Sequence, residues 1–193
     1  MSNNIEKIFQ TNAPVYWAKG YSAIPIKQGS KAPAITQWSG YNANLPSVER
    51  QSEWLKKHPD AGLGICTGTP LADGSILLAI DVDEPRLVRF IEKVVRNSPC
   101  KKVGKKGVTI FARAPKRTKS RKFGRAKGSP QVEIFGTTGC IVLPPSIHPD
   151  TGMPYQWVGT PLHDIDSEEL PLLTEGLSQG DRLGLVLSVD DPG

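Results

Sequence analysis

The sequence lacks several features that would assign it to a broad class of protein at once. It has no uninterrupted apolar run near the roughly 18–20 residues that a membrane helix needs, and its first residues lack the basic-then-apolar layout of a signal peptide. The three cysteines, Cys66, Cys100 and Cys140, lie far apart and form no Cys-x-x-Cys pair. We therefore expect a cytoplasmic protein with no membrane partner, no disulfide framework and no cysteine-based zinc or redox centre.

Acidic residues are missing altogether from residues 101–127, although the chain has 19 of them. The same segment holds 12 of the 24 lysines and arginines, so the formal charge of +5 divides into a strongly basic block and a remainder with a charge of −7. Such a block favours a polyanionic partner, while a solvated basic loop is the alternative. We expect the contacts to nucleic acid to come from Lys116, Arg117, Lys119, Arg121 and Lys122.

The apolar pattern predicts a domain in which helices and strands alternate. Helices are expected over 5–18, over 47–57 with Ser47 as the N-cap, and around 87–95, where apolar residues recur with helical spacing. Strands are expected over 21–26, 62–66, 76–80, 108–112, 132–135 and 140–143, the last two as a hairpin. This order indicates an α/β or α+β fold with a mixed sheet. We expect residues 1–162 to form the domain and residues 163–193 an acidic tail or linker.

Two carboxylates follow the most apolar of these strands. Asp81 and Asp83 stand two residues apart after Ile76-Leu77-Leu78-Ala79-Ile80, and strand alternation places such a pair on one face. Carboxylate oxygens suit Mg²⁺ or Mn²⁺, and a cation would offset the repulsion between the two acids. An Asp-x-Asp pair alone is also found in nucleases, in glycosyltransferases and in plain surface turns.

Glu133 adds a third carboxylate. It lies within the apolar strand Val132 to Phe135, directly after the basic block. A single acid there could simply face solvent, but three carboxylates on two strands match the needs of two-metal nucleotidyl transfer. We therefore expect Asp81, Asp83 and Glu133 to be the catalytic metal ligands, with neighbouring lysines and arginines holding triphosphate and nucleic-acid backbone.

Several segments resemble the archaeo-eukaryotic primase superfamily, and in particular the primase-polymerase domain of plasmid and phage replication proteins. The resemblance covers roughly residues 12–160. The segments that carry it are Trp17-Ala18-Lys19-Gly20-Tyr21, Gly29-Ser30-Lys31-Ala32-Pro33, Gly62-Leu63-Gly64-Ile65, Leu78-Ala79-Ile80-Asp81-Val82-Asp83, Val132-Glu133-Ile134 and Leu143-Pro144-Pro145-Ser146-Ile147-His148-Pro149, with Tyr155 and Trp157 beyond.

The resemblance implies an archaeo-eukaryotic primase fold, with an RRM-like catalytic sheet beside a smaller N-terminal α/β unit. It also implies synthesis of primers or DNA on a DNA template from nucleoside triphosphates, with a replicative helicase as a possible partner. The nucleotide-binding residues that it suggests are Lys105, Lys106, Thr109, Ser146 and His148. Thr109 stands where relatives carry a histidine, so Lys105 and Lys106 are expected to supply the positive charge.

Two further functions stay open beside nucleotidyl transfer. One is a non-catalytic nucleic-acid-binding module with a decayed primase fold, which the threonine at position 109 mildly favours. The other is a two-metal nuclease, against which the sequence shows no general-base histidine or lysine near the acids. Among individual residues, Lys31 could contact template phosphate or be a solvated surface lysine. His148 could bind triphosphate or metal, or fix the proline-rich turn by hydrogen bonding.

Overall fold

The computed structural model describes residues 7–116, 118–124 and 132–173 as three α-helices, two 3-10 helices and nine strands. The helical segments are α1 (Ile8–Ala18), η1 (Trp38–Asn42), α2 (Val48–Lys57), α3 (Pro85–Val94) and η2 (Ser167–Glu169). The strands are β1 (Ala23–Ile26), β2 (Gly62–Cys66), β3 (Ile76–Val82), β4 (Cys100–Val103), β5 (Val108–Ala114), β6 (Arg121–Phe123), β7 (Val132–Phe135), β8 (Cys140–Leu143) and β9 (Gln156–Gly159).

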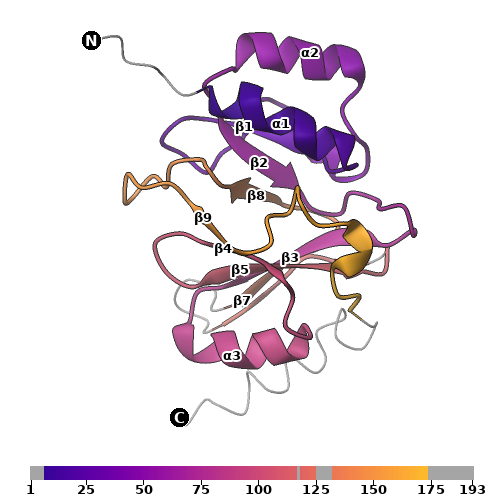
Figure 1. Cartoon of the computed structure of the whole chain (residues 1–193), viewed down its shortest axis with the longest axis vertical. Coiled ribbons are helices and arrows are strands. Elements are labelled where there is room, and N and C mark those ends of the chain that lie inside the picture. The colour runs from indigo at the N-terminus through magenta and orange to yellow at the C-terminus, as the bar shows by residue number, and fades with distance from the viewer. Residues whose placement is uncertain (1–6, 117, 125–131, 174–193) are drawn as a thin grey trace.

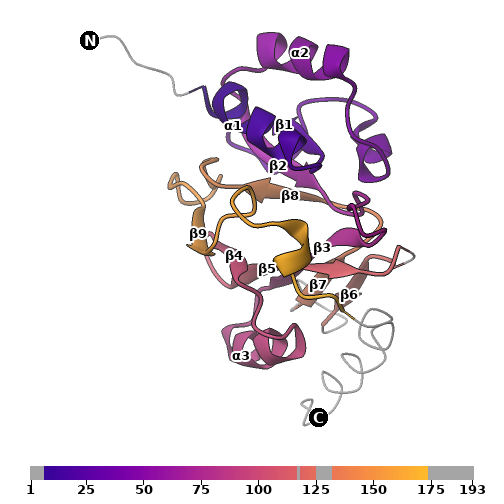
Figure 2. The same cartoon turned by 45° about the vertical axis from the view of Figure 1, so that its right-hand side comes forward.

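The strands form two sheets that lie in a stack of layers (Figure 1). Helices α1 and α2 lie on one side of a three-stranded sheet with the order β1-β2-β8. Below it lies a six-stranded sheet with the order β6-β7-β3-β5-β4-β9, and α3 covers the outer face of that sheet, as the second view confirms (Figure 2). The fold is therefore α+β, with a large sheet beside a smaller N-terminal α/β unit, as the resemblance implies.

Alternation along β3 divides its side chains between two cores. Ile76, Leu78 and Ile80 belong to a cluster with Ile91 of α3. Leu77 and Ala79 belong instead to the larger cluster, which includes residues of α1 and of the three-stranded sheet. The face of β3 that continues from Leu77 and Ala79 is therefore turned toward the smaller sheet, and Asp81 lies next on this face.

Local sequence explains where the helices begin. The Ser47 hydroxyl accepts a hydrogen bond from the backbone N–H of Arg50 at 3.3 Å, which confirms the N-cap expected for α2. Pro85 occupies the first turn of α3, where a missing N–H removes no helical hydrogen bond. Among the described residues, no helix has both the length and the apolar composition that crossing a membrane requires.

The hairpin expected between residues 132–135 and 140–143 is wrong. β7 pairs with β3 and β6, whereas β8 pairs with β2, so the connection carries the chain from one sheet to the other. Both glycines of this connection are tightly enclosed. A Cβ on Gly136 would lie 2.2 Å from the Thr118 carbonyl oxygen, and one on Gly139 would lie 2.6 Å from the Phe135 ring. The turn is thus shaped by packing between sheets, which a local turn pattern does not reveal.

Other departures concern the sheets and the end of the domain. All pairings between the named strands are antiparallel, so the expected mixed sheet is wrong. The chain also stays packed beyond residue 162. The Arg113 guanidinium donates to the carbonyl oxygens of Leu170 at 2.8 Å and Glu168 at 2.9 Å, and Leu173 is buried. Residues 174–193 of the expected tail lie outside the described residues.

Candidate active site

A single row of side chains crosses the entire six-stranded sheet. Its members are direct register partners on neighbouring strands, so alternation places them on the same face. In order across the sheet, the row is Lys122 on β6, Glu133 on β7, Asp81 on β3, Thr109 on β5, Lys102 on β4 and Trp157 on β9. Two of the three expected acids are thus adjacent at the centre of this row, with lysines on both sides of them.

Asp81 lies within β3 rather than after it, because the strand continues to Val82. The Thr109 hydroxyl donates a hydrogen bond of 2.6 Å to the Asp81 carboxylate. Thr109 therefore faces the acids, and Val108 and Ile110 pack in the core beneath α3, as expected from strand alternation. Of the two strands that carry Asp81 and Glu133, the Thr109 strand β5 adjoins only β3, which carries Asp81; Glu133 lies on β7, on the other side of β3.

Asp83 and Glu133 each have a lysine partner. Lys106 Nζ lies 3.6 Å from an oxygen of Asp83, and Lys122 Nζ lies 2.9 Å from an oxygen of Glu133. With the side chains in these positions, no three His, Cys, Asp or Glu residues of the described segments are placed to hold one ion. The backbone nevertheless suits a cation, because Asp81 and Glu133 are directly opposed and such pairs have Cβ atoms roughly 4.5–5.5 Å apart.

The turn Gly104-Lys105-Lys106-Gly107 is pressed against the acidic strand, and both glycines are required there. Gly107 has a φ of 64°, and a Cβ on it would lie 2.0 Å from the Val82 carbonyl oxygen. A Cβ on Gly104 would lie 2.7 Å from the Tyr155 ring. This close approach places Lys106 beside Asp83, while Lys105 lines the same cavity and pairs with Asp150.

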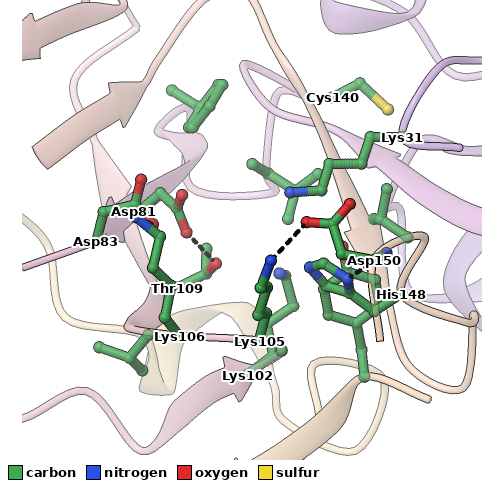
Figure 3. A pocket seen from close by; sticks show the side chains of 16 residues that line it. Lys31, Asp81, Asp83, Lys102, Lys105, Lys106, Thr109, Cys140, His148 and Asp150 are labelled. Carbon is green, nitrogen blue, oxygen red and sulfur yellow. Dashed lines mark hydrogen bonds and ion pairs between the residues drawn. The ribbon is translucent and has the colours of Figure 1, made fainter. Parts of the chain in front are cut away.

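These groups line one cavity of about 330 Å³ (Figure 3). Asp81, Asp83 and Thr109 line it from the large sheet, and residues 140–142 of β8 line it from the small one. Its charged and polar lining residues are Lys31, Asp81, Asp83, Lys102, Lys105, Lys106, Thr109, His148, Asp150 and Tyr155. Glu133 is not among the lining residues. The cavity therefore brings three carboxylates, Asp81, Asp83 and Asp150, together with four lysines.

His148 both lines the cavity and fixes a turn. Its Nδ1 accepts a hydrogen bond from the Asp150 backbone N–H at 3.1 Å, and its ring lies 5.0 Å from that of Tyr155. Burial lowers the pKa of His148, and the nearby Lys31 ammonium acts in the same direction. The ring is thus held in its neutral form, so it can offer a hydrogen bond to a ligand but little positive charge.

Ser146 lies apart from this cavity. Its hydroxyl accepts from the Leu63 N–H at 2.6 Å and donates to the Leu63 carbonyl oxygen at 3.2 Å, joining the loop after β8 to β2. The residue lines a different cavity, with Ile26 and Gly62. The Ser146 hydroxyl thus both donates and accepts a hydrogen bond within the protein, so its position favours a structural role over nucleotide binding.

The basic block does not form one continuous face. Lys116 and Lys119 are exposed near β6, an edge strand. Within β6, Arg121 is the register partner of Ile134 and Lys122 that of Glu133, so the two point to opposite faces of the sheet. Arg117 lies outside the described residues. The block is thus divided between the cavity, which Lys102, Lys105 and Lys106 line, and the exposed residues around the β6 edge.

Comparison with known families identifies the chain. Its residues 13–173 match the family described as bifunctional DNA primase/polymerase, N-terminal. The chain belongs to this family. Membership implies primase- or polymerase-type nucleotidyl transfer at the level of the family, with DNA and nucleotides as substrates. Comparison with curated proteins gave no match.

Lys102 is a site residue that the sequence patterns do not reveal. It lies in a run of four residues, Cys100 to Val103, with no pattern strong enough to indicate that it is buried beside the acids. The expectation that no lysine lies near the carboxylates, which weighs against a nuclease, is wrong because Lys102 and Lys106 share their cavity.

Proposed function

We propose that this domain of the primase/polymerase family extends primers or DNA on a DNA template, with Asp81, Asp83 and Glu133 holding Mg²⁺ or Mn²⁺. The observation that carries this proposal is the acid-centred row across the sheet, opening into a cavity lined by lysines. Carboxylates are the ligands these ions prefer, and lysines are suited to phosphates. When bound, such ions stabilise the attacking 3′-oxygen and the leaving pyrophosphate.

The protein's own residues supply the positioning. Thr109 holds the Asp81 carboxylate in one orientation through its 2.6 Å hydrogen bond. Lys106 and Lys122 neutralise Asp83 and Glu133 in the free protein. We infer that both lysines turn to substrate phosphates when those carboxylates hold a cation, because the same ammonium groups pair equally well with phosphate oxygens.

Nucleotide and template would then occupy different parts of the molecule. The triphosphate enters the cavity beside Lys105, Lys106 and His148. The template backbone runs along the β6 edge, where Lys116 and Lys119 are exposed. Plasmid- or phage-type replication and a replicative helicase partner follow from the family resemblance alone and stay predictions.

An extension assay tests the proposal. Wild-type protein is incubated with labelled ribo- or deoxynucleoside triphosphates, a primed or unprimed template, and Mg²⁺ or Mn²⁺. We expect extension by the wild type, none by Asp81→Asn, and normal extension by the matched control Asp60→Asn, whose carboxylate lies outside the active-site cavity. Asp81→Asn should still bind template, because the DNA contacts lie elsewhere.

The alternatives give different outcomes in the same experiment. Template degradation that depends on Asp81 would establish a two-metal nuclease. Template binding without extension or degradation by the wild type would establish a non-catalytic module. Equal extension by wild type and Asp81→Asn would overturn the catalytic assignment.

A further inference from the structure

Lys102 is a lysine in an unusual position. It lies on β4, inside the six-stranded sheet, and is only 7% exposed. Its side chain lines the active-site cavity, next to Thr109 in the cross-strand row. The Tyr155 ring lies beneath its ammonium group, with 4.5 Å between Nζ and the ring centroid. The aromatic face therefore supports the ammonium group from one side and leaves it directed toward the cavity.

Other lysines around the acids have carboxylate partners, but Lys102 has none in the described part of the chain. Lys105 pairs with Asp150 at 3.3 Å, and Lys106 and Lys122 pair with Asp83 and Glu133. For Lys102 the structure shows the contact with Tyr155 and no ion pair or side-chain hydrogen bond among the described residues. Burial lowers the pKa of Lys102 to about 8, against the opposing effect of Asp81. A buried ammonium without an anion is unfavourable unless a ligand supplies one.

Lys31 provides a second cation in the same space. It comes from the loop after β1, in the N-terminal unit, and extends into the cavity from the opposite side to Asp81 and Asp83 (Figure 3). Its charge lowers the pKa of both Lys102 and His148, so the three groups are close enough to interact. Within the described segments Lys31 also has no carboxylate partner. Two cations, one from a strand of the large sheet and one from a loop of the N-terminal unit, thus converge with no carboxylate partner among the described residues.

We propose that Lys102, with Lys31 opposite it, forms the anion site of the cavity and binds the phosphates of the incoming nucleoside triphosphate. The inference rests on the proposed function, in that the cavity takes a nucleotide. Lys105 and Lys106 also line the cavity, but they reach a phosphate only by leaving their carboxylate partners. The Thr109 hydroxyl already donates to Asp81, and burial lowers the pKa of His148, which disfavours a positive charge on its ring. A template phosphate would be less favourable here than at the exposed β6 edge, because Lys102 is nearly enclosed.

The test is a binding measurement that needs no catalysis. Calorimetric titrations use inorganic tripolyphosphate, a non-hydrolysable deoxynucleoside triphosphate and the corresponding nucleoside, each with and without Mg²⁺. Lys102→Met keeps an unbranched apolar side chain that matches the lysine stem, and it removes the ammonium group with its charge. We expect it to weaken tripolyphosphate and triphosphate binding by roughly ten-fold to a hundred-fold, as for loss of a charged hydrogen bond. Nucleoside binding should be unchanged.

Lys101→Met is the matched control. Lys101 is on the same strand but pairs with Glu92 of α3 at 2.6 Å, so its variant loses the same charge on the other face. We expect less than a two-fold change in tripolyphosphate affinity for this control. Lys31→Met, on an exposed loop, provides a second test that does not alter the packed sheet and should weaken binding in the same direction.

Unchanged tripolyphosphate affinity in Lys102→Met, or an equal loss in Lys101→Met, would overturn the inference. If Lys102→Met did not fold, Lys31→Met would decide, and unchanged affinity there would equally overturn it. The two proposals also fail separately. A wild type that extends primers while Lys102→Met binds tripolyphosphate normally refutes only the anion site, whereas Lys102-dependent binding without extension refutes only the polymerase.

Discussion

Removing the buried charge at position 102 should make the protein more stable. Lys102 is enclosed by the sheet and the Tyr155 ring, and burial lowers its pKa from 10.5 to about 8. A shift of one unit corresponds to about 1.4 kcal/mol, so keeping this lysine charged in the folded protein costs about 3 kcal/mol at neutral pH. Lys102→Met removes that cost while preserving the apolar contacts of the side chain.

The effect depends on pH in a defined direction. Below pH 8 the lysine is protonated in both the folded and the unfolded chain, and the full cost is present. Between about pH 8 and 10.5 the unfolded chain retains the proton that the folded protein loses, so wild-type stability rises relative to the variant. Lys102→Met should therefore be more stable at pH 7 by up to about 3 kcal/mol, a rise in Tm of about 6–12 °C for a domain of this size.

Denaturant unfolding of both proteins at pH 7, 8.5 and 10 measures this difference. Comparing the two proteins at each pH cancels other groups that titrate in the alkaline range, such as Tyr16, whose pKa burial raises. We expect the advantage of the variant to shrink steadily as pH rises. A variant less stable than wild type at pH 7, or an advantage independent of pH, would refute the reasoning that Lys102 is buried as a cation without an anion.

Substitutions elsewhere in the site and at the β6 edge have equally definite expected effects. Gly107→Ala should lower the free energy of unfolding by more than about 1 kcal/mol. The loss should exceed that of the control Gly74→Ala, because Gly74 also has a positive φ but has open space where a Cβ would lie. Equal losses in the two variants would exclude the close approach of Gly107 to β3. Thr109→Val should slow extension about ten-fold or more without weakening template binding, since it deletes a hydrogen bond to the Asp81 carboxylate; an unchanged rate would exclude a positioning role. Neutralising the described basic residues around β6 should reduce the log–log salt slope of DNA binding by about 0.7–0.9 for each DNA phosphate that the protein no longer neutralises, and an unaltered slope would mean that they do not bind DNA. These residues are Lys116, Lys119 and Arg121; Lys122 is left unchanged because it pairs with Glu133 of the active site.

Patterns that act over a few residues predicted the parts of the fold that local physics determines. The helical spacing from Leu87 to Val95 predicted α3, and the apolar run before Asp81 predicted the buried strand that carries the acids. Alternation then predicted which face Thr109 occupies. In each case the relevant information is the spacing of apolar and polar residues along one element.

Pairing between distant segments could not be predicted in the same way. The turn 136–139 has the composition of a hairpin turn, yet β8 pairs with β2 instead of with β7. Which strand β8 pairs with depends on how the two sheets pack together. Lys102 could not be identified because the ring that covers its ammonium group belongs to Tyr155, which is distant in sequence. β6 was missed because two of its three residues are basic and exposed, which masks the period of a strand.

The row across the large sheet has a consequence for mutational tolerance. Next to it runs a second row, in which Ile134, Ile80 and Ile110 are direct partners and pack toward α3. Sliding β3 by one residue past its neighbours would exchange the two faces, burying Asp81 under the helix and exposing Ile80 in the cavity. Every such slip is therefore penalised by both the core and the charges. Substitutions that weaken the core should therefore unfold the domain and should not produce a folded sheet with a shifted register. We expect the loss of activity in core variants to follow the loss of folded protein.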